Sequence, residues 1–259
     1  MAWIAVLAMG LILGLLGGGG GILTLPILVN LFGVKPSEAT GGSLLVVGST
    51  SLLAVILELK SGRLDWRSIA WVGIPAAIGS VTARKLLIPL IPDQIGSFTK
   101  DDATLMAFGL LMVVVAYRMF RPPAGEPKPM TNSAMVASGI GVGLVGGLLG
   151  AGGGFLIVPL LTLGLGLEMP RAIPTSLAII STQSLAAVAS DLNRPYPWSM
   201  LGSIVGVSLL GMIIGLVLRP KIKGSNLKTA FGYLVVIVAI FTFYKVGVHH
   251  FAPPTSLAQ

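Results

Sequence analysis

Long apolar stretches separated by short polar segments dominate this 259-residue chain. Most are 16–23 residues long, close to the roughly 20 that cross a bilayer as a helix. The runs are Met1–Phe32, Gly41–Leu57, Ser68–Leu90, Thr104–Met119, Ser133–Leu167, Pro174–Ala189, Trp198–Leu218 and Asn226–Val246. Charged residues make up 10% of the chain, against about 25% in soluble domains. The sequence predicts an all-α polytopic membrane protein of about eight apolar segments and excludes a soluble globular domain.

Charge and composition exclude several other classes. The net charge of +8 comes from bases that lie between apolar runs without alternating aromatic residues, so they indicate membrane orientation and no nucleic acid. The chain has no cysteine, and His249-His250 lacks a third ligand at metal-binding spacing, so we expect no metal and no cofactor. Met1–Leu16 lacks the basic start and cleavage site of a signal peptide, and we expect it to be membrane-embedded.

The chain is an internal repeat. A shift of 133 residues aligns positions 10–58 with 143–191 without a gap, and 20 of these 49 positions are identical. The shift pairs Gly17–Gly21 with Gly150–Gly154 and Glu58 with Asp191. We therefore predict two homologous halves, residues 1–120 and 132–248, joined by a polar linker at 121–131 and followed by a tail at 249–259.

The first run of each half contains a glycine-rich interruption. A helix of 32 residues would be about 48 Å long, well beyond a hydrocarbon core of about 30 Å. Five consecutive glycines cost about 1 kcal/mol each in a helix. We therefore predict a break inside the membrane, with a second short helix starting near Ile22 and near Phe155.

An unwound backbone at membrane depth must line a cavity or be buried in protein. Free N–H groups and a positive helix end at such a break suit an anion. The candidate binding glycines are Gly19, Gly20, Gly21, Gly152, Gly153 and Gly154. Helix packing is the alternative role for glycine, and we expect it for the spaced pairs Gly10/Gly14, Gly202/Gly206 and Gly211/Gly215.

The doubled motif resembles a known family. Three glycines, four apolar residues and a proline are followed by Gly42-Ser43-Leu44 in the first half and by Thr175-Ser176-Leu177 in the second. This arrangement resembles the TauE/SafE sulfite exporter family over essentially the whole chain. The resemblance implies a small permease for sulfur-containing or carboxylate anions in a bacterial or archaeal plasma membrane.

Polar side chains near the breaks complete the predicted site. Thr40, Ser43, Thr175, Ser176 and Gln183 can donate hydrogen bonds to an anion without a fixed charge that would trap it; helix–helix hydrogen bonding is the alternative, which the family resemblance makes weaker for Thr175 and Ser176. Glu58 and Asp191 are the acids that the repeat pairs. They are candidates for ion coupling, with Lys60 and Arg194 as expected partners, and solvated loop acids are the alternative.

These features predict a secondary transporter of a small anion, most readily sulfite or an organosulfonate, working by alternating access. The rivals are a non-transporting membrane scaffold or assembly subunit and an intramembrane enzyme; the enzyme is disfavoured because the runs lack acid–base residues. Pairing of two copies into a homodimer is left open.

Counting bases predicts the orientation. Eight single crossings divide the bases 9:8, whereas runs that dip in and return at the glycines divide them 11:6. The second arrangement predicts inverted halves, with the 121–131 linker and the 219–228 loop in the cytoplasm.

Overall fold

The computed structural model describes residues 1–92, 94–95, 98–120, 130–150, 152–192 and 197–251. The first half contains α1 Ala2–Leu16, α2 Gly19–Leu31, α3 Pro36–Glu58 with a 3-10 turn Leu59–Ser61, α4 Trp66–Ser68, α5 Ile74–Thr82, α6 Ile88–Leu90, β1 Gln94–Ile95, β2 Phe98–Thr99 and α7 Lys100–Phe120. The π-helical turns Ile69–Gly73 and Ala83–Leu87 join α4, α5 and α6 into one helix.

The second half repeats this order of helices. It contains α8 Asn132–Leu149, α9 Gly154–Pro159 with a π-helical turn Leu160–Gly164, α10 Met169–Ala189, α11 Trp198–Leu218 with a 3-10 turn Arg219–Lys221, and α12 Gly224–Phe251. The antiparallel pair β1 and β2 is the only sheet in the described residues. The predicted helical architecture is therefore confirmed, apart from this short hairpin.

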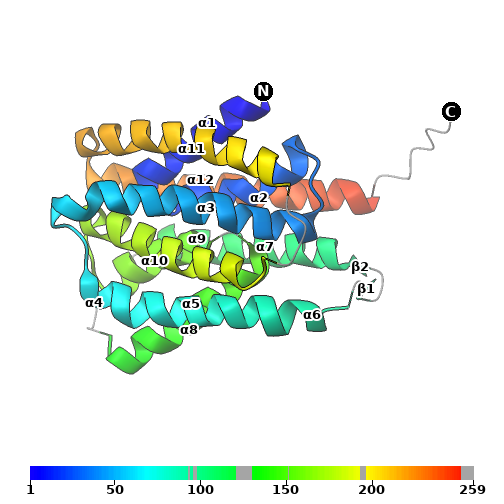
Figure 1. Ribbon diagram of the computed structural model, residues 1–259, viewed down its shortest axis with the longest axis horizontal. Helices are drawn as coiled ribbons and strands as arrows, with labels where there is room; N and C mark the ends of the chain where they lie inside the picture. The colour runs from blue at the N-terminus through cyan, green and yellow to red at the C-terminus, as the bar shows by residue number, and fades with distance from the viewer. Residues whose placement is uncertain (93, 96–97, 121–129, 151, 193–196, 252–259) are drawn as a thin grey trace.

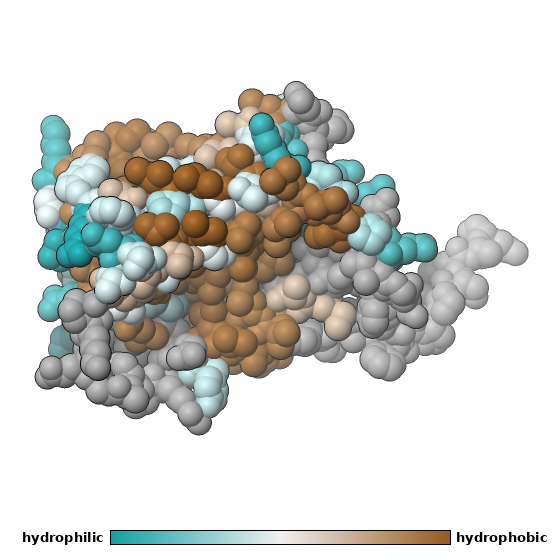
Figure 2. Space-filling model, turned by 90° about the horizontal axis from the view of Figure 1, so that it is seen from below, coloured by the Kyte–Doolittle hydropathy of each residue, from teal (hydrophilic) through white to brown (hydrophobic). Residues whose placement is uncertain are grey.

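Six helices in the described part of the chain are long and apolar enough to cross a membrane. They are Pro36–Ser61, Trp66–Leu90, Asn132–Leu149, Met169–Ala189, Trp198–Lys221 and Gly224–Thr242. Large hydrophobic side chains such as Ile78, Leu210 and Ile237 remain exposed, and Figure 2 shows hydrophobic residues forming a broad band across one face. An apolar band of this kind suits contact with lipid.

The predicted glycine breaks are present. α1 ends because Gly17 adopts the left-handed conformation (φ 73°) and donates its N–H to Leu13 O at 2.8 Å. α8 ends in the same way at Gly150 (φ 70°). Beyond the first break the chain folds back, and the Thr24 hydroxyl lies 3.0 Å from the Met9 sulfur. Each long run is thus two helices, α1 and α2 in the first half and α8 and α9 in the second.

The helix starts after the breaks differ from the prediction. α2 begins at Gly19 and α9 at Gly154, ahead of the expected starts at Ile22 and Phe155. Tertiary packing overrides the low helix propensity of glycine here, because the first turn of α2 lies so close to α1 that an added Gly20 Cβ would be 2.5 Å from Leu13 Cβ. Most of the first glycine run is therefore helical.

Each half packs its first helix against the other half. α1 lies along α11, and α8 lies along α5 (Figure 1). A Cβ added to Gly10 would overlap the Ser208 carbonyl, and one added to its repeat mate Gly143 would overlap the Ala76 carbonyl. Small residues thus bring the backbones of both helix pairs into contact, as in membrane helix packing generally.

The other predicted packing glycines divide into two groups. Gly211 and Gly215 contact α1 through the backbone of Leu7 and Leu11, which confirms their predicted role. Gly202 and Gly206 have no described atom within 4 Å of an added Cβ, so the predicted close packing is absent within the described part of the chain. The spacing is the same in both pairs, and only the face that each pair presents differs.

α3 and α10 form the centre and run in opposite directions. The most apolar window of α10 is 78% buried, against 33% for α11. Thr40, near the start of α3, lies with Arg84 beside Asp191, just beyond the end of α10. Glu58, at the end of α3, pairs with Arg219. We call these two ends of the molecule the Arg84 end and the Arg219 end.

Candidate functional site

The two glycine breaks meet in the middle of the molecule. A Cβ added to Gly154 would lie 2.8 Å from Gly18 Cα, and α2 and α9 start at this contact. The structure therefore brings the two predicted glycine segments together, one from each half. The free N–H groups and positive end of α2 lie beside the start of α9, where an anion would be stabilised.

Close packing also explains why glycine occupies some of these positions. A Cβ on Gly20 would lie 2.5 Å from Leu13 Cβ, so Gly20 allows α2 to fold back onto α1. Gly153 is left-handed (φ 62°), and its added Cβ would lie 3.1 Å from a Val142 methyl group. Contact of these glycines with substrate stays a prediction.

The middle of α10 presents polar atoms to the second break. Gln183 is fully buried and donates from Nε2 to Gly152 O, while its Oε1 has no hydrogen-bond partner among the described residues. Ser184 is also fully buried, and its Oγ, likewise without a partner, lies 3.1 Å from an added Gly152 Cβ. A buried polar atom without a partner costs about 1–3 kcal/mol, so these atoms point to a ligand or water at this place.

The repeat mates of this region behave similarly. Ser51, which the repeat pairs with Ser184, and Ser43, which it pairs with Ser176, are both fully buried, and neither hydroxyl has a partner within the part of the chain that the structure describes. Ser51 and Ser184 were absent from the predicted site, although their identity in the two halves was a usable signal. Thr50, the mate of Gln183, instead bonds Val46 O and the Ser208 hydroxyl, so the two halves differ here.

The remaining predicted hydroxyls are bound by protein. The Ser176 hydroxyl donates to Ile173 O at 2.7 Å and reaches Gly17 O at 3.2 Å, so it lies at the first break. Thr40 lies against Gly150 at the second break, where its hydroxyl donates to Ser37 O and accepts from Arg84.

The Thr175 side chain binds the 62–65 loop and α10 itself rather than a glycine break. Its hydroxyl donates to Arg171 O at 2.7 Å and accepts the Asp65 N–H at 2.9 Å. These bonds tie the start of α10 to the 62–65 loop, so a role in holding substrate would require Thr175 to exchange a protein partner.

The paired acids each bind an arginine from the other half. Glu58 bonds Arg219, and Asp191 lies 3.6 Å from Arg84. The expected partner of Glu58, Lys60, is therefore wrong, and the expected partner of Asp191, Arg194, lies outside the described residues. Both arginines are almost fully buried, at 2% and 4% exposure, and Arg84 lies inside the helix Trp66–Leu90. Sequence spacing missed these partners because each comes from the opposite half.

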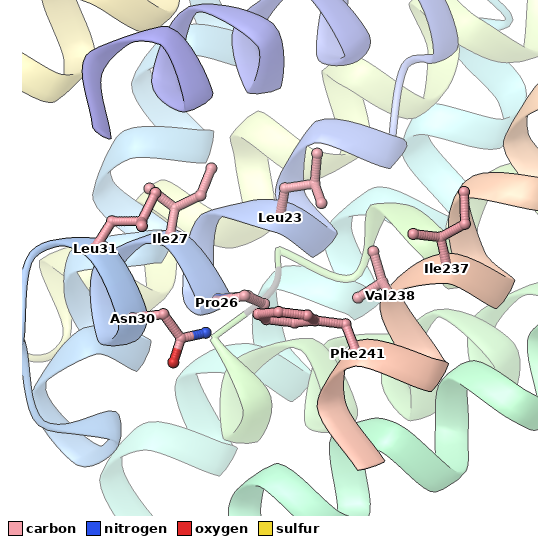
Figure 3. A pocket seen from close by; sticks show the side chains of 8 residues that line it. All are labelled: Leu23, Pro26, Ile27, Asn30, Leu31, Ile237, Val238 and Phe241. Carbon is pink, nitrogen blue, oxygen red and sulfur yellow. The ribbon is translucent and has the colours of Figure 1, made fainter. Parts of the chain in front are cut away.

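Two other kinds of site for a ligand are a metal centre and the apolar groove between α2 and α12. The described residues contain no group of three His, Cys, Asp or Glu side chains that could hold a metal ion. The side chains of His249 and His250 lie outside the described ones. A groove of about 220 Å³ between α2 and α12 is lined by Pro26, Phe241 and five other apolar side chains together with Asn30 (Figure 3). Its walls offer an anion no charged partner.

The fold and this site define a polytopic helical membrane protein whose halves join through broken helices. Residues 2–242 match the model of the sulfite exporter TauE/SafE family. The chain is 30% identical to a "probable membrane transporter protein" of Xylella fastidiosa (strain 9a5c), and the matched region covers 91% of each of the two chains. It is 26% identical to "probable membrane transporter protein YunE" of Bacillus subtilis, over 95% of this chain and 98% of the relative.

The chain belongs to the TauE/SafE family of membrane transporters. A relative from the archaeon Methanocaldococcus jannaschii, also named a probable membrane transporter protein, is 24% identical over 91% of this chain and 93% of its own length. No solved structure matches the chain significantly. The predicted family and the predicted transporter class are confirmed.

Proposed function

We propose that this protein moves a small anion, sulfite or an organosulfonate, across the plasma membrane of a bacterium or archaeon by alternating access. The carrying observation is the meeting of the two glycine breaks beside the buried Ser184 hydroxyl, which has no partner among the described residues, and beside Gln183, whose Nε2 could donate to an anion in place of Gly152 O. Hydroxyl, amide and backbone N–H donors can bind an oxyanion without a fixed charge that would hold it too tightly. The glycines 19–21 and 152–154, with Ser43 and Ser176, surround this place in the proposal.

The arrangement of the halves supports alternating access. The eight apolar segments form two inverted repeats in the proposal, because α3 and α10 occupy equivalent places in the repeat and run oppositely. The Glu58–Arg219 and Asp191–Arg84 pairs join the halves at opposite ends. Opening one end would separate one pair while the other end stays closed, and protonation of the released carboxylate would couple ion movement to transport.

The Arg219 end faces the cytoplasm in this proposal. Among the residues whose side chains the structure describes, it carries seven bases against three acids, whereas the Arg84 end carries three bases against two acids. The bases are Lys60, Arg63, Arg67, Arg171, Arg219, Lys221 and Lys223 at the first end, and Lys35, Arg84 and Lys85 at the second. Cytoplasmic loops are the basic ones in membrane proteins.

Flux of ³⁵S-labelled sulfite and labelled methanesulfonate into proteoliposomes tests the function. We expect saturable uptake of at least one of the two anions, absent from protein-free vesicles. Lack of saturable flux for every small anion tried would favour the scaffold alternative. That alternative explains the packing glycines of α1 and α11 but leaves the unpartnered polar atoms of α3 and α10 without a purpose.

A further inference from the structure

We propose that a cavity at the Arg219 end is an entry site, where Arg219 and Arg63 bind the substrate oxyanion before it reaches the glycine breaks. The inference rests on the proposed function and adds a second site to it. The cavity measures about 230 Å³ and is lined by Arg63, Pro170, Arg219, Ile222, Gly224 and Leu227 among others. At about 30 Å³ per water molecule, this volume accommodates a small oxyanion and a few waters.

Arg219 supplies a buried donor that the protein leaves unused. Its guanidinium bonds Glu58 through Nη2, while Nη1 is buried and has no hydrogen-bond partner among the described residues. The residue is only 4% exposed, so water does not readily satisfy this group. An arginine fork suits planar and tetrahedral oxyanions because it offers parallel N–H donors.

Arg63 gives this cavity an excess of positive charge. It is exposed on the 62–65 loop and lines the same cavity as Arg219, so two guanidinium groups line a cavity whose described wall contains no carboxylate. The Oε2 atom of Glu58 is also buried and has no hydrogen-bond partner in the described part of the chain, so the Glu58–Arg219 pair is only partly satisfied there. A bound oxyanion would add acceptors for Arg219 and balance the second arginine.

The neighbouring acids do not compete for this place. Asp65 is engaged by the Ser68 N–H at 3.0 Å and by Arg171 at 3.6 Å. Glu168 lines a separate cavity of about 450 Å³, which shares Pro170 and Gly224 but has no base in its wall. An anion is therefore favoured in the Arg63–Arg219 cavity and disfavoured in the adjoining one.

The test compares Arg63→Gln with Lys223→Gln. Both remove one exposed base from the same end, but Lys223 does not line the cavity. For labelled sulfite supplied to the Arg219 end, we expect Arg63→Gln to raise KM by about fivefold or more with the maximal rate within about twofold. Lys223→Gln should leave both within about twofold. Arg219→Lys, which keeps the charge but loses the fork, should also raise KM.

Equilibrium binding of the same labelled sulfite to the purified full-length protein separates this inference from the proposed function. If flux is saturable but Arg63→Gln and Lys223→Gln match in KM and Kd, the entry site is wrong and the transport function stands. If the wild type binds sulfite in an Arg63-dependent way without flux, the transport function fails and the site stands. Absence of both binding and flux overturns both for sulfite.

Discussion

At the residue scale, some buried hydroxyls join two helices by hydrogen bonds, whereas others have no hydrogen-bond partner among the described residues. The Ser208 hydroxyl bonds Val205 O at 2.9 Å and Thr50 at 2.8 Å, joining α11 to α3. The Ser184 hydroxyl is equally buried but has no partner among the described residues. The two serines therefore predict opposite effects of the same substitution.

Ser184→Ala should leave stability unchanged or slightly raised, because it removes an unpaired polar atom, and should raise the KM for sulfite by about 5- to 20-fold. Ser208→Ala is the matched control: it should cost about 1 kcal/mol of stability and leave KM unchanged. Thermal unfolding in detergent and proteoliposome flux measure the two effects. A loss of stability with an unchanged KM in Ser184→Ala would give that hydroxyl a purely structural role.

The two ion pairs Glu58–Arg219 and Asp65–Arg171 differ in burial, and we therefore expect them to contribute differently to stability. Removing Arg219 strands a buried Glu58, so Arg219→Gln should destabilise the protein by about 3–5 kcal/mol, and the double variant Glu58→Gln/Arg219→Gln should recover most of it. The Arg171 side chain is 54% exposed in its pair with Asp65, so Arg171→Gln should cost less than about 1 kcal/mol. Chemical unfolding of the three variants checks this, and equal losses for Arg219→Gln and Arg171→Gln would contradict it.

At the scale of elements, the contact between the two breaks sets the geometry of the site. A Cβ on Gly154 would push against Gly18 and against the Ile180 side chain, whereas a Cβ on Gly206 would enter open space. Both glycines are helical, so alanine favours the local backbone in each case.

We expect Gly154→Ala to abolish flux while the protein still inserts and elutes as a single species, because α2 and α9 must separate to admit the methyl group. Gly206→Ala should transport like the wild type. Size-exclusion profiles and flux per inserted molecule provide the measurement. Wild-type flux in Gly154→Ala would remove the meeting of the breaks from the mechanism.

The sequence predicted some of these elements and not others, for physical reasons. The doubled glycine runs are local features, so both breaks were predictable from helix propensity and length. The partners of Glu58 and Asp191 come from the opposite half, and their identity depends on packing that spacing does not encode. Thr50 and Gln183 occupy the same repeat position but bind different groups, so the repeat alone could not assign their roles.

At the scale of the whole molecule, the predicted orientation can be read chemically, because the chain has no native cysteine. Single cysteines at Glu126 and Gly224 should both react with a membrane-impermeant maleimide from the cytoplasmic side, and one at Gly33 should react from the outside. Gly33 serves as the control for accessibility, since an added Cβ there meets no atom within 4 Å. Labelling of positions 126 and 224 from opposite sides would refute the inverted arrangement.

The packing of each half's first helix against the other half also affects the order in which the protein folds during synthesis. α1 cannot cover its Gly10 and Gly14 face until α11 has been synthesised, about 200 residues later. At about 5–20 residues per second, α1 waits on the order of 10–40 s in the bilayer with its contact surface open. Because α1 packs on α11 and α8 packs on α5, neither half can bury its own first helix, and we expect folding to finish only when the whole chain has been made.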